Sequence, residues 1–395
     1  MNTIRPISIL LAAVFVAGCA SGKSPKTTAT VEANDRWNAA RSGVLLTLAE
    51  DQFEAGNLEK SRLTADEALA LNPSDARLLV LRARIAVEQG RLEDADRDLD
   101  AAMPLMPGDA ELAYLAGVVD ERRQRPTEAL AHYASASAAA SDEAAYFIAH
   151  AEALVVLDRV HQALALLNDS VPRFEHSAPV RSAIAELHMR QGEFAEAAEM
   201  YRHASVLDRD DLFLRERLAV ATYQAGRMRE AELELGRLVK EPTFADRGDL
   251  WLAYGETLLA IGQFKDSRDA FLESTKLAPR NPATWSGLAK ASIELGDARR
   301  ATAAARQVEA LSPQRADTHL LLGMSAQVAG EFDAALAAFR FAARLDPTDP
   351  LPACLEGRLL QQQGDDQGAA AAFQRALLIE PSDPLARQLL ATLGG

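Results

Sequence analysis

Residues 316–349 have the sequence ADTHLLLGMSAQVAGEFDAALAAFRFAARLDPTD, and the 34 residues on either side of this stretch follow the same pattern. Glycines recur at a step of 34 residues, at Gly262, Gly296, Gly330 and Gly364. Prolines recur with the same step, at Pro279, Pro313, Pro347 and Pro381. Self-similarity at a fixed period of this length is typical of proteins built from stacked structural repeats.

The same period extends over most of the chain. Ten units of 34 residues, with two extra residues in the sixth, fill residues 42–383 and begin at 42, 76, 110, 144, 178, 212, 248, 282, 316 and 350. We number the positions within a unit as phases 1 to 34. Phase 8 holds only alanine or glycine, and phase 20 holds only alanine or serine. Helices approach closely only where the contact residues are small, so these phases are predicted to lie at a helix–helix contact.

Local signals place two helices in each unit. Glycine at phase 15 readily adopts the left-handed backbone that ends a helix, and proline at phase 32 cannot continue one. The residues that follow this proline are suited to cap the next helix, among them Asp75, Asp109, Asp349 and Asp383. Each unit is therefore predicted to be a helix, a turn and a second helix.

Three features interrupt the pattern. Gln124 and Asp158 occupy the glycine position of repeats three and four. Pro104 and Pro172 fall inside second helices, which we expect them to shorten. The two extra residues of repeat six lie within 241–247. We expect the stack to flex or to change its curvature at these points.

The units resemble tetratricopeptide repeats. In repeat nine the resemblance rests on Leu322-Gly323 together with Ala335, Phe339 and Pro347, and along the chain it covers residues 42–383. It implies an all-α fold, a right-handed superhelical solenoid of about ten helix-turn-helix repeats with a concave inner face. It also implies a C-terminal capping helix over residues 384–395.

The N-terminal residues have the features of a secretion signal. Arg5 precedes an apolar run over residues 7–17, and the sequence VAG directly precedes Cys19. This arrangement resembles the lipobox of bacterial lipoproteins, in which the cysteine is lipidated and the chain is cleaved just before it. It implies a signal peptide over residues 1–18, and the polar residues 19–41 are expected to be the lipidated cysteine with a flexible tether. An ordinary signal peptide with a chance cysteine is the alternative.

Lipidation implies attachment to a membrane, because two or three acyl chains on one residue anchor a protein firmly. No aspartate follows Cys19 in Ala20 and Ser21, a pattern that implies outer-membrane sorting in enterobacterial lipoproteins. We therefore expect an envelope protein that is lipid-anchored in the outer membrane and faces the periplasm; sorting in other lineages stays open. No cofactor is expected apart from the covalent lipid on Cys19.

Composition excludes several classes of protein. Hydrophobic residues make up 48% of the chain, which is too many for a disordered protein. The net charge of −15 disfavours binding to nucleic acid. The seven histidines form no i, i+4 pair, and no hydrolase or zinc-protease motif occurs, so neither a metal site nor an enzyme is expected.

The resemblance implies that the first helix of each repeat lines a groove, chiefly at phases 2, 5, 9, 12 and 13. The predicted partner-binding residues are Tyr114, Val118, Ile148 and Glu152 in repeats three and four, and Leu252, Glu256, Leu320 and Met324 in repeats seven and nine. This apolar surface with interspersed glutamates suits a protein segment with apolar anchors and basic flanks. We expect neither Tyr114 nor Ile148 to lie at a helix contact. The alternative is that some of these apolar residues pack between repeats.

The expected function is a membrane-anchored periplasmic scaffold for protein–protein interactions that assists the assembly of a pilus or secretion complex. An adaptor for exopolysaccharide or cell-wall machinery is the alternative. A periplasmic hydrolase is disfavoured, because the repeats occupy almost the whole mature chain. Cys354, the remaining thiol, is expected to be a small apolar spacer on the inner face.

Overall fold

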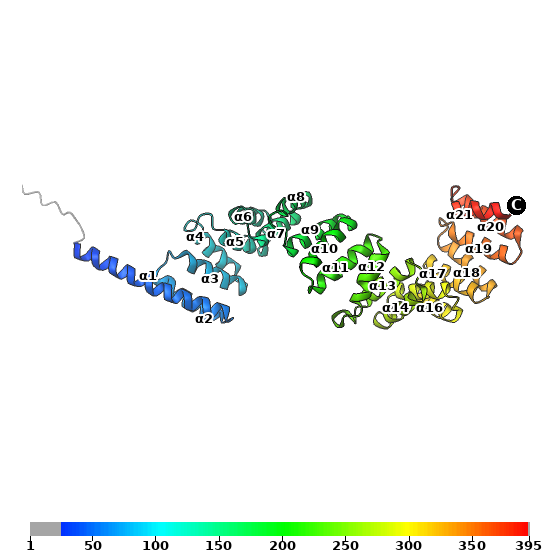
Figure 1. Cartoon of the computed structure of the whole chain (residues 1–395), viewed down its shortest axis with the longest axis horizontal. Coiled ribbons are helices and arrows are strands. Elements are labelled where there is room, and N and C mark those ends of the chain that lie inside the picture. Colours follow the sequence, from blue (N-terminus) through cyan, green and yellow to red (C-terminus); the bar gives the residue numbers. More distant parts are fainter. Residues whose placement is uncertain (1–24, 394–395) are drawn as a thin grey trace, which may run out of the picture. The chain divides into compact units, whose positions relative to one another are not determined.

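The computed structural model describes residues 25–393, and within this range every regular element is a helix (Figure 1). These are 21 α-helices and one short 3₁₀ helix, which follow one another as helix-turn-helix pairs. The predicted all-α repeat fold is thereby confirmed. None of the helices described is both long enough and apolar enough to cross a bilayer. The predicted signal peptide and Cys19 lie outside the described residues.

Contacts between residues divide the chain into two compact bodies, Met1–Arg159 and Val160–Gly395, which we call the N-terminal and C-terminal bodies. The division falls in the turn of repeat four, after Arg159, which follows the turn residue Asp158. The N-terminal body contains α1 (Pro25–Glu54), α2 (Leu58–Leu71), α3 (Ala76–Glu88), α4 (Leu92–Ala102), α5 (Ala110–Arg122), α6 (Pro126–Ala139) and α7 (Ala144–Val156).

The C-terminal body begins with the second helix of repeat four. Its elements are α8 (Val160–Ser170), α9 (Ala178–Gln191), α10 (Phe194–Leu207), α11 (Leu212–Gln224), α12 (Met228–Leu238), η1 (Pro242–Phe244), α13 (Gly248–Ala260), α14 (Phe264–Leu277), α15 (Pro282–Glu294), α16 (Ala298–Leu311), α17 (Ala316–Val328), α18 (Phe332–Leu345), α19 (Leu351–Gln362), α20 (Asp366–Ile379) and α21 (Pro384–Leu393). The last of these, α21, packs against α20 as a capping helix.

The first helix, α1, differs from the expected tether. It has 30 residues and begins at Pro25, well before residue 42, where repeat one is expected to begin (Figure 1). No glycine or proline interrupts the sequence between Lys26 and Arg41. Residues 42–54 are held in a helix by packing on α2, and extending a formed helix avoids the cost of nucleation. Residues 25–41 therefore continue that helix.

Small residues bring the two helices of a repeat together in every repeat that lies within one body. The residues at phases 8 and 20 are buried in all ten repeats. Where serine replaces alanine at phase 20, its hydroxyl donates a hydrogen bond to the backbone carbonyl at phase 8. Ser61 Oγ lies 2.7 Å from the oxygen of Ala49, and Ser267 Oγ lies 2.8 Å from that of Gly255. The prediction that these phases meet at the helix contact is confirmed.

Helices begin at the predicted capping residues. The Asp109 carboxylate accepts a hydrogen bond from the backbone N–H of Leu112 at 2.8 Å. Asp383 does the same for Ala386 at 2.6 Å, at the start of α21. Each carboxylate satisfies a backbone donor that the first turn of a helix leaves without an internal partner.

Prolines and the insertion modify particular helices. The second helices α4 and α8, which precede Pro104 and Pro172, have 11 residues each, whereas α10 and α18 have 14. The predicted shortening is confirmed. The insertion in repeat six contains η1, whose Phe244 side chain is buried against the core that includes Leu235 and Leu250.

Candidate functional site

Several first helices of neighbouring repeats lie next to one another in each body. In the C-terminal body α13 contacts α15, and α15 contacts α17. In the N-terminal body α1 contacts α3, and α3 contacts α5. Stacked repeats present equivalent positions on the same side. We call the side formed by phases 2, 5 and 9 of the first helices the inner face.

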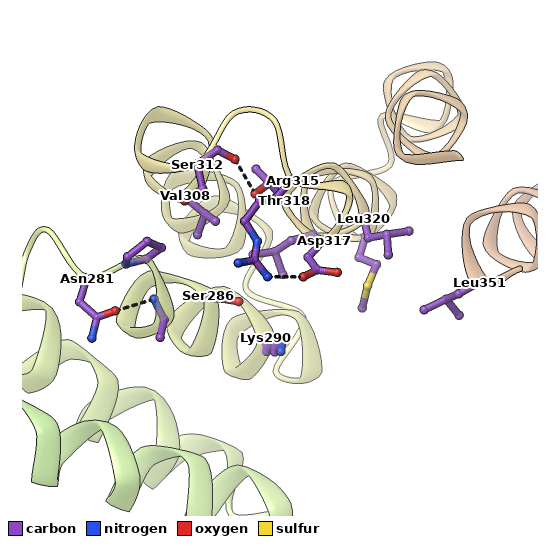
Figure 2. Close-up of a pocket in the computed structure, with 14 residues that line it drawn as sticks. Asn281, Ser286, Lys290, Val308, Ser312, Arg315, Asp317, Thr318, Leu320 and Leu351 are labelled. Atoms are coloured by element: carbon purple, nitrogen blue, oxygen red, sulfur yellow. Dashed lines mark hydrogen bonds and ion pairs between the residues drawn. The ribbon is translucent and has the colours of Figure 1, made fainter. Parts of the chain in front are cut away.

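A cavity of about 600 Å³ opens on the inner face of repeats eight to ten (Figure 2). Its walls come from α15, the end of α16, α17 and the start of α19. The lining residues at phases 2, 5 and 9 are Ala283, Ser286, Lys290, Asp317, Leu320, Met324 and Leu351. Two of the predicted binding residues, Leu320 and Met324, are thus brought together at one cavity.

The apolar side chains at this cavity differ in their exposure. Leu320 is buried and belongs to the core cluster of Phe339, so most of its surface serves packing. Met324 is half-buried, and Leu351, on the far side of the cavity in Figure 2, is 40% exposed. Met324 and Leu351 therefore supply the apolar surface that a partner could cover.

Hydrogen bonds fix the polar rim of the cavity. The Thr318 hydroxyl donates to the carbonyl oxygen of Ser312 at 2.9 Å. The Asn281 side-chain oxygen accepts from the backbone N–H of Ala283 at 3.0 Å and caps α15. These bonds hold the loops that enter α15 and α17.

Charge at the cavity is positive overall. Arg315 and Asp317 form an ion pair, with Nη2 2.8 Å from Oδ2, so their charges offset each other (Figure 2). Lys290 is exposed and makes no hydrogen bond or ion pair with any residue between 25 and 393. At this cavity the free charge thus suits an acidic group, in contrast to the basic flank expected from the sequence.

Leu252 and Glu256 lie on α13, outside this cavity. Leu252 is half-buried and packs against the core cluster of Phe271. Glu256 accepts a hydrogen bond from the Tyr223 hydroxyl. Burial is the main cause that raises the pKa of Tyr223 to about 12, and this hydrogen bond is the second cause. Glu256 therefore already has a partner within the C-terminal body.

The other four predicted residues belong to the N-terminal body, on α5 and α7: Tyr114, Val118 and Ile148 are half-buried, and Glu152 is exposed. The Tyr114 ring lies with its centroid 5.7 Å from that of Tyr133 on α6 and 5.0 Å from that of Tyr146 on α7. Tyr114 thus packs against two neighbouring helices. The expectation that Tyr114 avoids helix contacts is wrong, because its ring is large enough to reach both.

A second cavity, of about 330 Å³, lies on the inner face of repeats five and six and was not predicted from the sequence. It is lined by Met189, Tyr201, Phe213, Glu216, Arg217 and Val220. Phe213 is exposed at its edge, and Glu216 is held by an ion pair with Arg247 at 2.8 Å. Phe213 and Leu351 both occupy phase 2, so a large apolar residue at that phase is the signal that identifies both cavities.

Cys354 on α19 is buried, and its Sγ lies 3.9 Å from a carboxylate oxygen of Asp383. Burial, followed by the charge of Asp383, raises the pKa of the thiol to about 11. The thiol is therefore protonated at neutral pH, as in a packing residue. Across residues 25–393, no three His, Cys, Asp or Glu side chains are grouped so as to hold a metal ion.

The sequence profile described as tetratricopeptide repeat matches residues 46–110, 182–245, 216–282 and 286–350, together more than half of the chain. The chain belongs to the tetratricopeptide repeat family. Members of this family are generally non-enzymatic scaffolds that bind protein partners.

Several solved structures are similar in fold. MamA (residues 41 to the end) from Desulfovibrio magneticus RS-1 is 19% identical, with 44% of this chain and 98% of that chain covered and a TM-score of 0.40. Yeast Tom70 is 12% identical, with 89% and 88% covered and a TM-score of 0.41. A tetratricopeptide repeat protein from Parabacteroides merdae ATCC 43184 is 16% identical, with 81% and 99% covered and a TM-score of 0.37. No curated protein sequence matches the chain.

Proposed function

We propose that this protein is a membrane-anchored scaffold of the bacterial envelope that binds segments of partner proteins on the inner face of its repeats. The observation that carries the proposal is the cavity of about 600 Å³ lined by inner-face residues of three successive repeats. Its volume lies in the range of ligand-binding pockets, and its lining combines apolar and polar groups as the lining of such pockets does.

The residues that line the cavity indicate the chemistry of the segment that binds there. An apolar side chain covers Met324 and Leu351, and an acidic group beside it pairs with Lys290.

In this proposal the lipid on Cys19 attaches the protein to the outer membrane on its periplasmic side. The support is the sequence pattern before Cys19, which matches the lipobox. There the scaffold assists the assembly of a pilus or secretion complex, a role suited to a long array of repeats that holds several segments at once. Replacement of Cys19 by alanine is expected to release the protein from the membrane fraction; retention at high salt contradicts the anchor.

The partner can be identified by photo-crosslinking. A photo-reactive amino acid at position 324 of the full chain, in a bacterium that exports and lipidates it, should capture the bound protein. The control is the same residue at position 299, which is exposed on α16. A pilus or secretion component captured at 324 alone supports the proposal. Capture of a polysaccharide or cell-wall enzyme at 324 supports the alternative function, an adaptor for that machinery. Equal capture at positions 324 and 299 contradicts a binding site on the inner face.

A matched pair of variants separates binding from folding. Leu351 is 40% exposed at the cavity, and Leu378 is 82% exposed on α20. Replacing either leucine by serine removes exposed apolar surface, so both variants should melt as the parent does. Only Leu351→Ser is expected to weaken capture of the partner, by about tenfold. Equal effects of the two variants would place the binding surface elsewhere.

A further inference from the structure

An apolar stripe runs along one side of α1 and is covered by no residue that the structure describes. Trp37 is 67% exposed, Val44 71% and Leu48 45%. Together with the exposed Ala33 and Ala40, they follow one another at spacings of four, three, four and four residues, which places them on one face of the helix. These five residues form the α1 stripe, which extends over about 22 Å.

The equivalent positions in other repeats are buried. Val44 occupies phase 3, where Leu214 and Leu250 are buried in repeats six and seven. Leu214 belongs to a core cluster with Tyr201 of α10, and Leu250 to one with Leu235 of α12. In each case the second helix of the preceding repeat covers this side of the first helix. Repeat one has no preceding repeat among the described residues, so its stripe offers a surface that is made for a packed helix.

The chain's own N-terminal segment does not reach this surface if it is cleaved at Cys19, a step that rests on the proposed lipidation. Residues 20–24 then separate the anchor from Pro25, a reach of about 20 Å when fully extended. Val44 and Leu48 lie about 28 and 35 Å along the helix from Pro25. Even a folded-back segment leaves both residues uncovered.

The surface at the other end of the repeats is of a different kind. There α21 covers α20, and α21 presents the exposed residues Arg387 and Gln388. A polar capping helix does not match an apolar stripe, so stacking of one chain's first repeat on another chain's capping helix is disfavoured. The α1 stripe is matched instead by a second α1 stripe.

Charges beside the stripe also permit two copies to meet. Arg41 forms an ion pair with Glu67 of α2 at 2.7 Å, so its charge is offset within the chain. Asp51 is exposed near the C-terminal end of α1. In an antiparallel pair of α1 helices the two Asp51 residues lie at opposite ends of the interface, so these like charges do not face each other.

We infer that the α1 stripe is an interface for a second copy of this chain, with two α1 helices packed antiparallel about a two-fold axis. A two-fold axis pairs the same patch of both copies and closes the assembly at two. Ala33 and Ala40 allow close approach of the helices, and Trp37, Val44 and Leu48 supply the buried apolar area. On a membrane, tethering raises the effective concentration of the two copies.

Site-directed photo-crosslinking tests the interface in the full chain. A photo-reactive residue at position 44 should yield a covalent dimer that contains only this chain. The same residue at position 388, on the polar side of α21, should yield none. Crosslinks at position 44 to lipid or to a different protein, no crosslink at all, or equal dimer yields at both positions would overturn the inference.

Co-purification of two differently tagged copies provides a second measurement. Trp37→Ser combined with Leu48→Ser should reduce co-purification about tenfold, because the stripe loses two of its large apolar residues. The matched control, Leu233→Ser with Leu378→Ser, removes two exposed leucines from second helices and should leave it unchanged. A melting temperature equal to that of the parent shows that both double variants fold. If the Trp37→Ser/Leu48→Ser variant still co-purifies as the parent does, the α1 stripe is not the interface. Cys19→Ala, tested separately, reports on the lipid anchor alone.

Discussion

A Cβ atom on Gly323 would lie 2.4 Å from Cε1 of Phe339, which is closer than side chains approach without displacement. The same clash between phases 8 and 24 recurs in the pairs Gly117–Tyr133, Gly255–Phe271 and Gly357–Phe373. Where leucine occupies phase 24, alanine occupies phase 8, as in Ala83–Leu99, Ala151–Leu167 and Ala219–Leu235. Repeat five, with Ala185 and Tyr201, is an exception. Glycine at phase 8 therefore makes room for an aromatic ring from the second helix.

This pairing predicts strong coupling between Gly323 and Phe339. Gly323→Ala should lower the free energy of unfolding by about 1–3 kcal/mol, because Phe339 has no space to move within the core. Combining it with Phe339→Leu recreates the alanine–leucine pair of other repeats, so the double variant should lose less than its two single variants together. Urea denaturation of the four proteins gives the coupling energy. Additive losses would show that the two side chains do not interact.

Two turn residues predict stabilising substitutions. Gln124 and Asp158 have φ angles of 61° and 59°, in the left-handed region where other repeats have glycine. Side chains other than glycine are strained there by about 1–2 kcal/mol. Gln124→Gly relieves this strain, but glycine loses more chain entropy on folding, which offsets part of the gain. The net effect should be a rise of about 1 kcal/mol in the free energy of unfolding. Gly90→Ala, at φ 72° with open space around it, is the reverse control and should destabilise.

Buried tyrosines predict a loss of stability in alkali. Burial raises the pKa of Tyr201 to about 12, above the value of about 10 for an unfolded chain. The folded state thus holds the phenol proton more tightly, so the stabilisation is complete below pH 10 and is lost as the pH rises toward 12. Melting temperatures between pH 8 and 11.5 should fall less steeply for Tyr201→Phe than for the parent. Identical slopes would show that this hydroxyl does not titrate with unfolding.

A buried carboxylate connects repeats nine and ten. Glu356 has a side chain only 5% exposed, and it accepts hydrogen bonds from Arg340 Nε at 2.7 Å and Arg375 Nη2 at 2.5 Å. Glu356→Ala should cost about 2 kcal/mol, because both guanidinium groups lose their acceptor. Asp317→Ala breaks the exposed pair with Arg315 and should cost about 0.5 kcal/mol or less. Similar losses in thermal unfolding for both variants would contradict this distinction.

Most of the fold could be predicted because its determinants are local. The phase-8 and phase-20 residues and the turn glycines act within one repeat, Asp109 caps the helix directly after it, and the structure places them as their chemistry requires. The extension of α1 to Pro25 was missed, since it depends on propagation from a packed helix and not on any capping signal. The two-sided contact of Tyr114 depends on the size of neighbouring rings, which a single phase does not reveal. The cavities at Phe213 and Leu351 have a signal in the sequence, a large apolar residue at phase 2, but their extent depends on side chains from neighbouring repeats and is seen only in the structure.

The contacts of Tyr114 separate it from its neighbour Ile148 in a last prediction. Tyr114→Ser should lower the free energy of unfolding by about 2 kcal/mol, because the ring packs against both Tyr133 and Tyr146. Ile148→Ser removes a smaller, half-buried side chain on the inner face and should cost about 1 kcal/mol or less.

Capture of a partner by the N-terminal body is therefore tested with Ile148→Ser, and the control is Val156→Ser, which removes an exposed apolar residue from the end of the same helix. Reduced capture for Ile148→Ser alone, with a melting temperature close to that of the parent, supports a binding surface on α7. If Ile148→Ser melts as low as Tyr114→Ser, both residues belong to the core and the inner face of repeats three and four is a packing surface.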